Sequence, residues 1–231
     1  QRRRRLAVSV RGDDVVVEQI LAGHQPIESF AVPLELLKRC EGTKDDPVAL
    51  ERRGPDVEAR WTDAGVPQTA AFPVAEPFDR PPIPDRREAN DPRLIPALRD
   101  AADSTDAAST RYALACLQLR AEGGRIAATD SRQLLVQDGF RFPWEGDLLV
   151  PGNPVFACRD LHQETVSIGR SDDWVTVQAG DWSVHLRIRK DARFPNVDSI
   201  LPRAESALSV LTLDPRDAEF LLDRLPKLPA R

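Results

Sequence analysis

Alternation of apolar and polar residues recurs along the chain and predicts many short β-strands. The clearest run is VHLRIR at 184–189, in which valine, leucine and isoleucine alternate with polar residues. Period-two alternation is typical of a strand with one buried face and one solvated face. The same reading predicts strands at Leu6–Val10, Val15–Leu21, Val48–Glu51, Val57–Trp61, Gln68–Phe72, Arg125–Thr129, Leu134–Gln137, Thr165–Ile168, Trp174–Gln178 and Ser183–Ile188.

Two Asp-Pro pairs predict helix starts. Asp91-Pro92 and Asp214-Pro215 each combine an N-cap residue with a proline that needs no N–H in the first helical turn. Apolar residues then recur at helical spacing. Because Pro96 falls inside the first of these patterns, that helix either begins there or bends there.

An internal repeat with a constant offset organises the chain. Val32-Pro33 and Val150-Pro151 lie 118 residues apart, and so do Cys40 and Cys158. Each copy predicts two strands, a helix of about ten residues entered at the Val-Pro pair, and three further strands. We therefore expect residues 32–84 and 150–202 to superpose. Further pairs at this offset are Val48 with Val166, Val57 with Val175, and Pro84 with Pro202.

Proline-rich stretches close each copy and predict the domain boundaries. They read FPVAEPFDRPPIP and FPNVDSILP. The repeat predicts a partial domain, the back half of one unit, at 1–85. A complete domain follows at 86–204, and 205–231 starts a further one. The element order indicates an α+β fold with predominantly antiparallel sheets. Because the chain begins with Gln1 and contains no methionine, we expect a processed or internal piece of a longer protein.

Composition narrows the function classes. The 231 residues carry a net charge of −5, which argues against a uniformly basic DNA-binding surface but leaves room for a local basic face. Cys40, Cys116 and Cys158 show no CxxC spacing, so buried reduced thiols are expected rather than a disulfide framework or a zinc site. No apolar run is long enough for a membrane span and no signal peptide is evident, which favours a cytoplasmic protein.

Four separated motifs in order carry a resemblance to a known family. They are TRYALACLQL, GRIAATDSRQLL, LLVPGNPVFACRDL and FPNVDSILP. Together they resemble the bacterial DNA sliding clamp, the beta subunit of DNA polymerase III, best over Asp91–Pro202 and more weakly over Leu6–Pro84. The resemblance implies the DNA-clamp fold: repeated domains with antiparallel sheets outside and helices inside. The resemblance further implies that six such domains, from a homo-oligomer of two chains, form a ring around double-stranded DNA.

The resemblance also implies a processivity factor that binds peptides of DNA polymerase and the clamp loader in a hydrophobic groove. This chain has Thr-Asp-Ser-Arg-Gln-Leu where the family pattern is Thr-Asp-Gly-His-Arg-Leu, so the turn and the choice of partner can differ. A capped hairpin over a core leucine is the alternative for this corner. Carried over by position, the groove comprises Leu114, Thr129, Asp130, Arg132, Leu134 and Pro202.

DNA contacts are expected to be electrostatic and independent of sequence. Arg111 and Tyr112 match the loop of the family that approaches DNA, and Arg99 and Arg159 are expected to point into the hole from helices. Nearby carboxylates dilute these charges, so a solvated helix face is the alternative for each. The remaining basic residues on predicted helices are Lys38, Arg39, Arg216 and Arg224.

No constellation for catalysis is evident. His24, His162 and His185 do not share metal-ligand spacing with the cysteines, and neither a Gly-rich phosphate loop nor a GxSxG elbow occurs. We therefore expect a protein that is not an enzyme and needs no cofactor or metal. Two alternatives stay open: a clamp-fold interaction protein that does not load on DNA, and a β-rich enzyme whose site leaves no motif.

Overall fold

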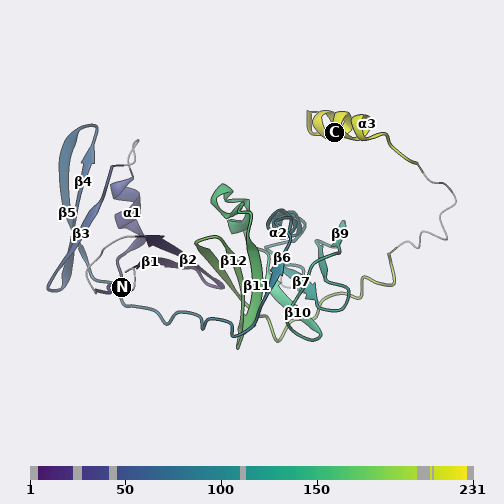
Figure 1. Cartoon of the computed structure of the whole chain (residues 1–231), viewed down its shortest axis with the longest axis horizontal. Coiled ribbons are helices and arrows are strands. Elements are labelled where there is room, and N and C mark those ends of the chain that lie inside the picture. Colours follow the sequence, from purple (N-terminus) through teal and green to yellow (C-terminus); the bar gives the residue numbers. More distant parts are fainter. Residues whose placement is uncertain are drawn as a thin grey trace. The chain divides into compact units, whose positions relative to one another are not determined.

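The structure, a computed structural model, describes residues 5–22, 28–41, 46–109, 113–201, 209 and 211–227 (Figure 1). Two compact units divide the chain, Gln1–Phe194 and Pro195–Arg231. The domain bounds drawn from the repeat remain a prediction.

Short strands and few helices make up the first unit, and every pairing between its strands is antiparallel. This confirms the α+β class. The helical segments are α1 (Leu34–Cys40), α2 (Leu94–Asp103) and the 3₁₀ turns η1 (Pro154–Ala157) and η2 (Arg159–Leu161). The strands are β1 (Arg5–Arg11), β2 (Val15–Ala22), β3 (Ala49–Arg53), β4 (Asp56–Asp63), β5 (Val66–Pro73), β6 (Arg87–Asn90), β7 (Cys116–Arg120), β8 (Arg125–Thr129), β9 (Leu134–Gln137), β10 (Asp147–Pro151), β11 (Val166–Ser171), β12 (Trp174–Ala179) and β13 (Trp182–Arg187).

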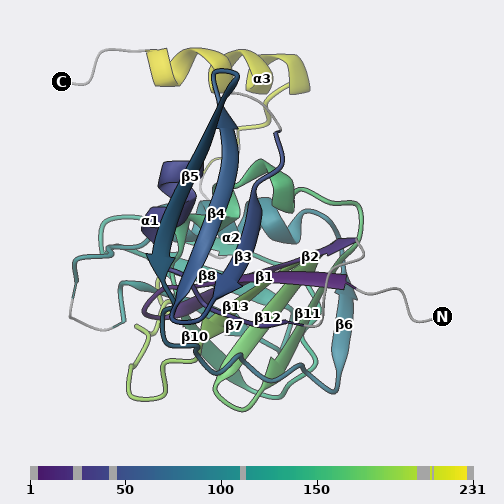
Figure 2. The ribbon, with the colours of Figure 1, turned by 90° about the vertical axis from the view of Figure 1, so that its left-hand side faces the viewer.

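The strands form three sheets. Their orders are β1-β2-β13-β12-β11-β6, β10-β7-β8-β9 and β3-β4-β5. The six-stranded sheet joins sequence-distant segments, because β2 pairs with β13 in a register that sets Val17 opposite Val184. Figure 2 shows the three-stranded sheet and the helix α1, which packs against β4.

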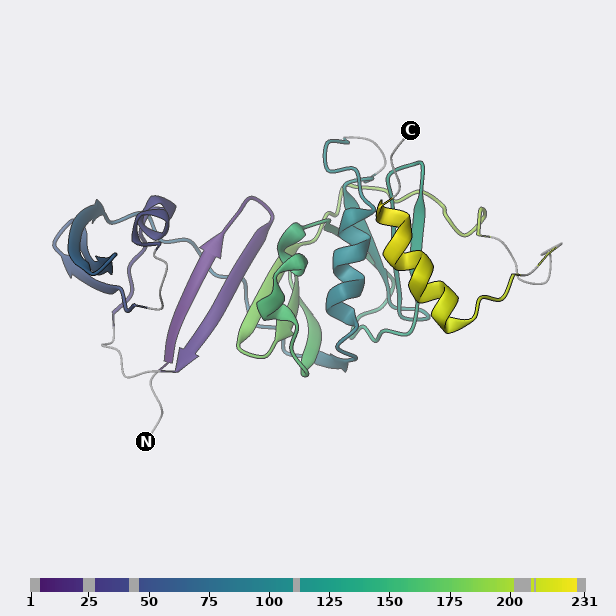
Figure 3. The same cartoon turned by 90° about the horizontal axis from the view of Figure 1, so that it is seen from above.

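One main core fills the space between the two larger sheets and their helices. Leu94, Leu98 and Ala101 of α2 are fully buried with Ile126 and Ala128 of β8. The helix α2 also packs against η1, and Figure 3 shows these two helical segments side by side. A smaller core under α1 combines Leu36, Ala59 and Phe72. Helices therefore cover the apolar faces of the strands, as the fold class requires.

The repeat predicted from the sequence is present in the structure. Asp56 begins β4 and Trp174, 118 residues later, begins β12. The turns before these strands also match, because Gly54 and Asp172 both take a left-handed backbone, with φ of 64° and 45°. Each copy follows a helical segment with three antiparallel strands in meander order, β3-β4-β5 or β11-β12-β13. The two copies therefore share one topology.

The helices of about ten residues that the Val-Pro pairs were expected to enter are shorter than predicted and begin later. Pro33 lies just before α1, and Val150-Pro151 ends strand β10 instead of starting a helix. The first, α1, has seven residues, and the second copy has only η1 and η2, of four and three residues. The Asn153 side chain accepts a hydrogen bond from the Val155 N–H and starts η1. Cys158 then adopts an extended backbone, which separates the two turns. Two short turns, the first capped by Asn153, therefore stand where one continuous helix was predicted.

Pro96 does not start its helix. The helix α2 begins at Leu94, so Pro96 is its third residue and lies in the first turn. N–H groups of the first turn have no partner within the helix, so proline costs little there.

A linker between β5 and β6 covers the outer face of the six-stranded sheet. Arg80 forms an ion pair with Glu18, and the Arg11 guanidinium lies over the Phe78 ring. Ser171 donates a hydrogen bond to the Pro82 carbonyl. These contacts attach the proline-rich segment to strands at both sides of the sheet.

The second unit contains α3 (Pro215–Arg224) and the 3₁₀ turn η4 (Leu225–Lys227). Asp214 caps α3 by accepting a hydrogen bond from the Arg216 N–H, which confirms the Asp-Pro helix start predicted there. The start predicted at Asp91-Pro92 is displaced: Asp91 accepts from the Arg93 N–H in the turn before α2, but the N-cap residue of α2 is Arg93 and the helix begins at Leu94. Unlike α2, α3 has no buried residue.

We predict that Gly124→Ala strongly destabilises the protein. The added Cβ would overlap the backbone of Phe140, and Gly124 has a left-handed φ of 60°. Overpacking and backbone strain together should lower the free energy of unfolding by about 2–5 kcal/mol. Urea denaturation measures the change.

Gly123→Ala is the matched control for this substitution. Gly123 also has a left-handed φ, 75°, but no atom lies within 4 Å of the position that an added Cβ would take. Only the backbone cost of about 1 kcal/mol should appear. Equal losses in the two variants would contradict the predicted clash with Phe140.

Candidate functional site

The corner between β8 and β9 is a closed network of local hydrogen bonds. The Thr129 hydroxyl donates to the Gln133 carbonyl at 2.6 Å and accepts from the Ser131 N–H at 3.1 Å. The Asp130 carboxylate accepts from the N–H groups of Arg132 and Gln133, both at 2.8 Å. Such bonds fix a turn without help from the rest of the protein.

Ser131 occupies the position at which the clamp motif has glycine. Its φ is 78°, in the left-handed region that glycine adopts without strain. Serine therefore holds a backbone conformation that glycine would adopt without strain. The two bonds of the Thr129 hydroxyl and the pair accepted by Asp130 hold Ser131 in this conformation.

The pKa of Asp130 lies below its ordinary value of 3.8, because the N–H groups of Gln133 and Arg132 stabilise the carboxylate. The charged form is therefore the one that builds the corner at neutral pH. Arg132 and Gln133 are exposed beside it, which makes the rim of the corner polar.

The structure brings several of the predicted groove residues to one end of the four-stranded sheet. Leu134 pairs directly with Thr129 across β8 and β9 and is half-buried. Leu114 lies just before β7. Because β7 pairs antiparallel with β8, the start of β7 lies beside the end of β8. The Leu114 side chain is buried, with 8% exposed. Pro202 lies outside the described residues. An apolar groove at this corner therefore remains a prediction.

The predicted DNA-contacting residues are placed in part. Arg99 lies on α2, half-exposed, and forms an ion pair with Asp100 at 2.7 Å. Arg159 is exposed on η2, which follows the η1 turn that packs against α2. Arg111 and Tyr112 lie outside the described residues. Arg99 and Arg159 thus belong to neighbouring helical segments, and no structural observation tests their contact with DNA.

The helical segments are not basic. Counted over α1, α2, η1, η2 and α3, six lysine and arginine residues face seven aspartate and glutamate residues. Near-neutral helices give a weak attraction for phosphates, since affinity for the DNA backbone grows with the number of cations that contact it. The acidic residues of the chain are therefore not confined to the strands.

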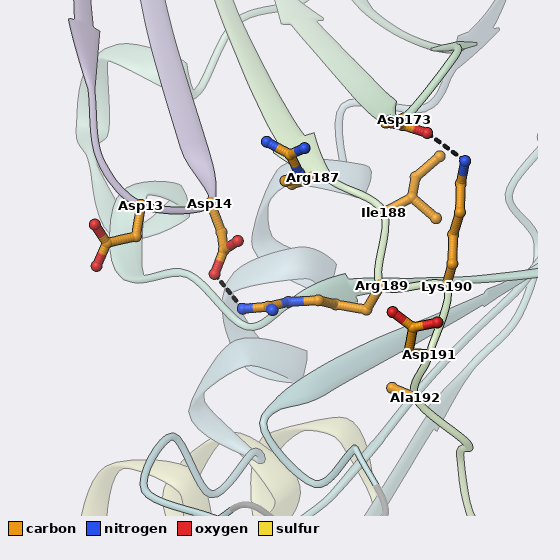
Figure 4. A pocket seen from close by; sticks show the side chains of 9 residues that line it. All are labelled: Asp13, Asp14, Asp173, Arg187, Ile188, Arg189, Lys190, Asp191 and Ala192. Atoms are coloured by element: carbon orange, nitrogen blue, oxygen red, sulfur yellow. Dashed lines mark hydrogen bonds and ion pairs between the residues drawn. The ribbon is translucent and has the colours of Figure 1, made fainter.

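A charged pocket of about 600 Å³ forms where the β1–β2 turn meets the end of β13 (Figure 4). Arg189 forms an ion pair with Asp14, and Lys190 with Asp173. The Arg187 N–H donates to the Asp14 carbonyl at 2.9 Å, which fixes the turn to the strand. Its lining residues are Asp13, Asp14, Asp173, Arg187, Ile188, Arg189, Lys190, Asp191 and Ala192.

The acidic and basic side chains that line this pocket neutralise one another, which indicates a structural junction. Lys190 lowers the pKa of Asp173 through its hydrogen bond and charge. Arg187 stacks over the Trp174 ring, 5.6 Å from its centre. Three cations thus already have partners within the fold. Sequence reasoning missed this junction because the two charged stretches lie at 13–14 and 187–191, with no shared motif.

The described cysteines and histidine have structural surroundings. Cys40, Cys116 and Cys158 are free thiols, but only Cys116 is buried, and Cys158 is exposed, which corrects the expectation that all three are buried. His185 is buried against Thr176 at 2.8 Å, and burial lowers its pKa. Among the described residues, no cluster of three or more potential metal ligands occurs.

None of the helices in the described part of the chain combines the length and apolar character that crossing a bilayer requires.

Antiparallel sheets, helical segments beside them in each repeat and the 118-residue offset together define the DNA-clamp fold. The resemblance inferred from the sequence is confirmed at the level of the fold by solved structures. The sequence itself matches no protein-family profile and no curated protein.

Two solved structures illustrate the likeness. The DNA polymerase III subunit beta from Pseudomonas aeruginosa superposes with a TM-score of 0.66 at 16% identity, over 87% of this chain and 58% of that chain. The Helicobacter pylori beta clamp bound to a DNA ligase peptide superposes with a TM-score of 0.68 at 15% identity, over 97% of this chain and 66% of that one. The chain thus spans about three fifths of the length of these clamps.

We predict that Ser131→Gly leaves the corner intact and stabilises it. Glycine removes the strain of a left-handed serine but gains freedom in the unfolded chain, so the free energy of unfolding should rise by up to about 1 kcal/mol. Ser167→Gly, inside β11, is the control and should lower it by about 0.5–1 kcal/mol. Urea denaturation of both variants measures the difference, and equal destabilisation would contradict strain at Ser131.

Proposed function

We propose that the protein is a DNA sliding clamp, a non-enzymatic and cytoplasmic processivity factor. In this proposal it forms a homo-oligomeric ring around double-stranded DNA and binds short peptides of polymerase, clamp-loader or related partners at the β8–β9 corner. Arg99 and Arg159 contact phosphates, with Arg111 and Tyr112 at the mouth of the hole. No cofactor or metal takes part.

The observation that carries the proposal is the hydrogen-bonded corner between β8 and β9. Thr129 and Asp130 build the turn with four hydrogen bonds, although Ser131 replaces the glycine of the motif. Strain held at one residue, with its neighbours arranged around it, is characteristic of functional positions. One solved structure with this fold has a DNA ligase peptide bound.

Leu134 is the residue through which the peptide site is tested. We expect Leu134→Lys to weaken binding of a DNA ligase peptide at least about tenfold, because a charge then faces an apolar anchor. Isothermal titration calorimetry with the unlabelled peptide measures affinity, and circular dichroism checks folding.

Val66→Lys, at an exposed position that begins β5, is the control with the same change of charge. It should bind the peptide like the parent protein. Unchanged affinity in the Leu134 variant, or equal losses in both variants, would contradict a peptide site at the corner.

DNA contact is tested by neutralising the two helical arginines. Each phosphate contact contributes roughly 0.9 to the slope of log affinity against log salt, so Arg99→Gln with Arg159→Gln should lower the slope by about 2. Retention on nicked circular DNA, compared with linear DNA, measures encirclement.

The control removes the same charge from the strand side of the molecule. Arg53 and Arg60 pair with Glu51 and Glu58 on the face of β3 and β4 that points away from the buried Val57 and Ala59. Their replacement by glutamine should leave the slope unchanged. An unchanged slope in the helical variant would reject the assignment of Arg99 and Arg159.

The charge of the helical segments favours a second candidate. With seven acidic against six basic residues on these segments, a clamp-fold interaction protein that binds peptides but does not load on DNA is consistent with the structure. Peptide binding without retention on circular DNA would favour this candidate. Retention on circles with loss from linear ends would favour the sliding clamp.

A further inference from the structure

The outer face of the six-stranded sheet encloses a histidine. His185 is 6% exposed, and Thr176 beside it is 3% exposed. Val184 and Leu186, the neighbours of His185 in β13, belong to the main core, so His185 points to the opposite face of the sheet. Its Nδ1 atom lies 2.8 Å from the Thr176 hydroxyl. A titratable side chain is therefore enclosed on the face that the main core does not cover.

The strand registers place this histidine in a cross-strand row that the linker between β5 and β6 contacts. Cross-strand partners share a face. Arg11 lies in the row with its guanidinium over the Phe78 ring, and so does Gly169, where an added Cβ would lie 2.7 Å from Pro84. The linker therefore meets the row on both sides of the histidine. In order, the row consists of Arg11, Val16, His185, Thr176, Gly169 and Arg87.

The length of segment 78–84 matches a path straight across the sheet. From β1 to β11 there are four inter-strand spacings, which make roughly 19 Å at about 4.8 Å each. Six residue steps in the polyproline II conformation, at about 3.1 Å each, cover roughly the same span. Arg80 contacts Glu18 of β2 along this path. Pro81, at the middle of the segment, is buried, and the middle of the path is β13, the strand that carries the histidine.

The contacts that hold segment 78–84 can open locally. Arg80 and Glu18 form an ion pair in which the arginine side chain is 52% exposed. The Ser171 hydroxyl donates to the Pro82 carbonyl. The prolines of the segment have no N–H with which to join the strand ladder. Because exposed ion pairs and single hydrogen bonds are individually weak, the segment can leave the sheet while the strand pairing stays intact.

Cations outnumber carboxylates around His185. Burial, the largest cause, lowers the pKa of His185 below 6.5, Glu18 raises it and Arg87 lowers it further. The Glu18 carboxylate already accepts from Arg80 and from the Ser9 hydroxyl. The described strands β11 and β12 present no charged side chain on this face. The charged residues that the other elements place there are Arg11 of β1, Glu18 of β2, Arg80 and Asp85 of the linker, Arg87 of β6 and Arg187 of β13.

We propose that segment 78–84 is a pH-dependent clasp, which is closed over the six-stranded sheet while His185 is neutral and opens when His185 takes up a proton. In the closed form the clasp keeps water from the ring, and Glu18 is engaged with Arg80. In the open form water solvates the imidazolium. The clasp acts independently of DNA and peptide binding.

The direction of the pH dependence follows from the two forms. In the open form the pKa of His185 takes its ordinary value of 6.5, whereas in the closed form burial holds the pKa lower. The open form therefore binds the proton more tightly. The preference for the closed form is complete above pH 6.5 and decreases as the pH falls from 6.5 toward the lower pKa. Since one proton is taken up, opening increases at most about tenfold per pH unit.

Thiol labelling beneath the clasp measures its opening. Val16 is 2% exposed and pairs with His185, so Val16→Cys in a chain with Cys40→Ser and Cys158→Ser reports access to this face. Labelling by N-ethylmaleimide is divided at each pH by the labelling of the same cysteine in a His185→Gln chain, which cancels the titration of the thiol itself. We expect this ratio to rise at least about threefold from pH 7.5 to pH 5.5.

Two controls separate the clasp from other effects of pH. His162→Gln removes an exposed histidine and should leave the rise in the ratio unchanged. Cys116, 5% exposed in the four-stranded sheet, reports unfolding within the same chain and should stay unlabelled. A ratio that does not change with pH, or labelling of Cys116 that rises in parallel with that of Val16→Cys, would overturn the proposal.

An NMR titration tests the enclosure of the ring without an added cysteine. The chain has three histidines, so His24→Gln with His162→Gln leaves His185 as the only imidazole. We expect its pKa to lie below 6.5 and to rise toward 6.5 with Phe78→Ala, which loosens the clasp without a change of charge. Phe220→Ala, at an exposed position of α3, is the matched control. An unchanged pKa in the Phe78 variant, or an equal rise in both variants, would contradict a clasp over His185.

Discussion

The antiparallel pairing of β2 with β13 is the interaction on which the rest of the first unit depends. It joins a hairpin from residues 5–22 to a strand that ends at Arg187 and makes one six-stranded sheet from two copies of the repeat. The ion pair of Arg189 with Asp14 and the backbone bond from Arg187 to Asp14 secure the same junction at its end. Without this pairing, the first copy would hold only a small core under α1.

The same pairing explains why one face of the hairpin is covered and the other is open. The linker before β6 crosses the outer face, where Arg80 meets Glu18. On the other face, residues of α2, η1 and η2 share one core with β7, β8 and β11–β13, and Val15 of β2 packs against it. When a hairpin joins the edge of a sheet, its apolar face lies beyond the helices that cover the rest of the sheet. Another element is needed to bury that face. Repeat proteins commonly meet this need through neighbouring units.

The charges of this protein and its fold lead to different expectations for DNA binding. The fold is that of sliding clamps, yet the helical segments carry slightly more acidic than basic residues, and Arg99 is already paired with Asp100. The β8–β9 corner, in contrast, is held by local hydrogen bonds to Asp130 beside the left-handed Ser131. The turn depends on a few neighbouring residues, whereas a field of charge depends on many residues at once.

The sequence by itself determined the local elements: the strands by alternation, the Asp-Pro start of α3, the Thr-Asp corner and the 118-residue offset. Each of these depends on residues close together in the chain or on a simple comparison of its two halves, so short-range periodicity and capping suffice. Only the tertiary structure decided the pairing of β2 with β13, the charged junction of Asp14 with Arg189, and the replacement of a ten-residue helix by η1 and η2. It alone also assigned a left-handed backbone to Ser131 and buried Leu114 while leaving Cys158 exposed. The physical reason is that burial and strand partnership depend on contacts between residues far apart in sequence, which periodicity does not encode.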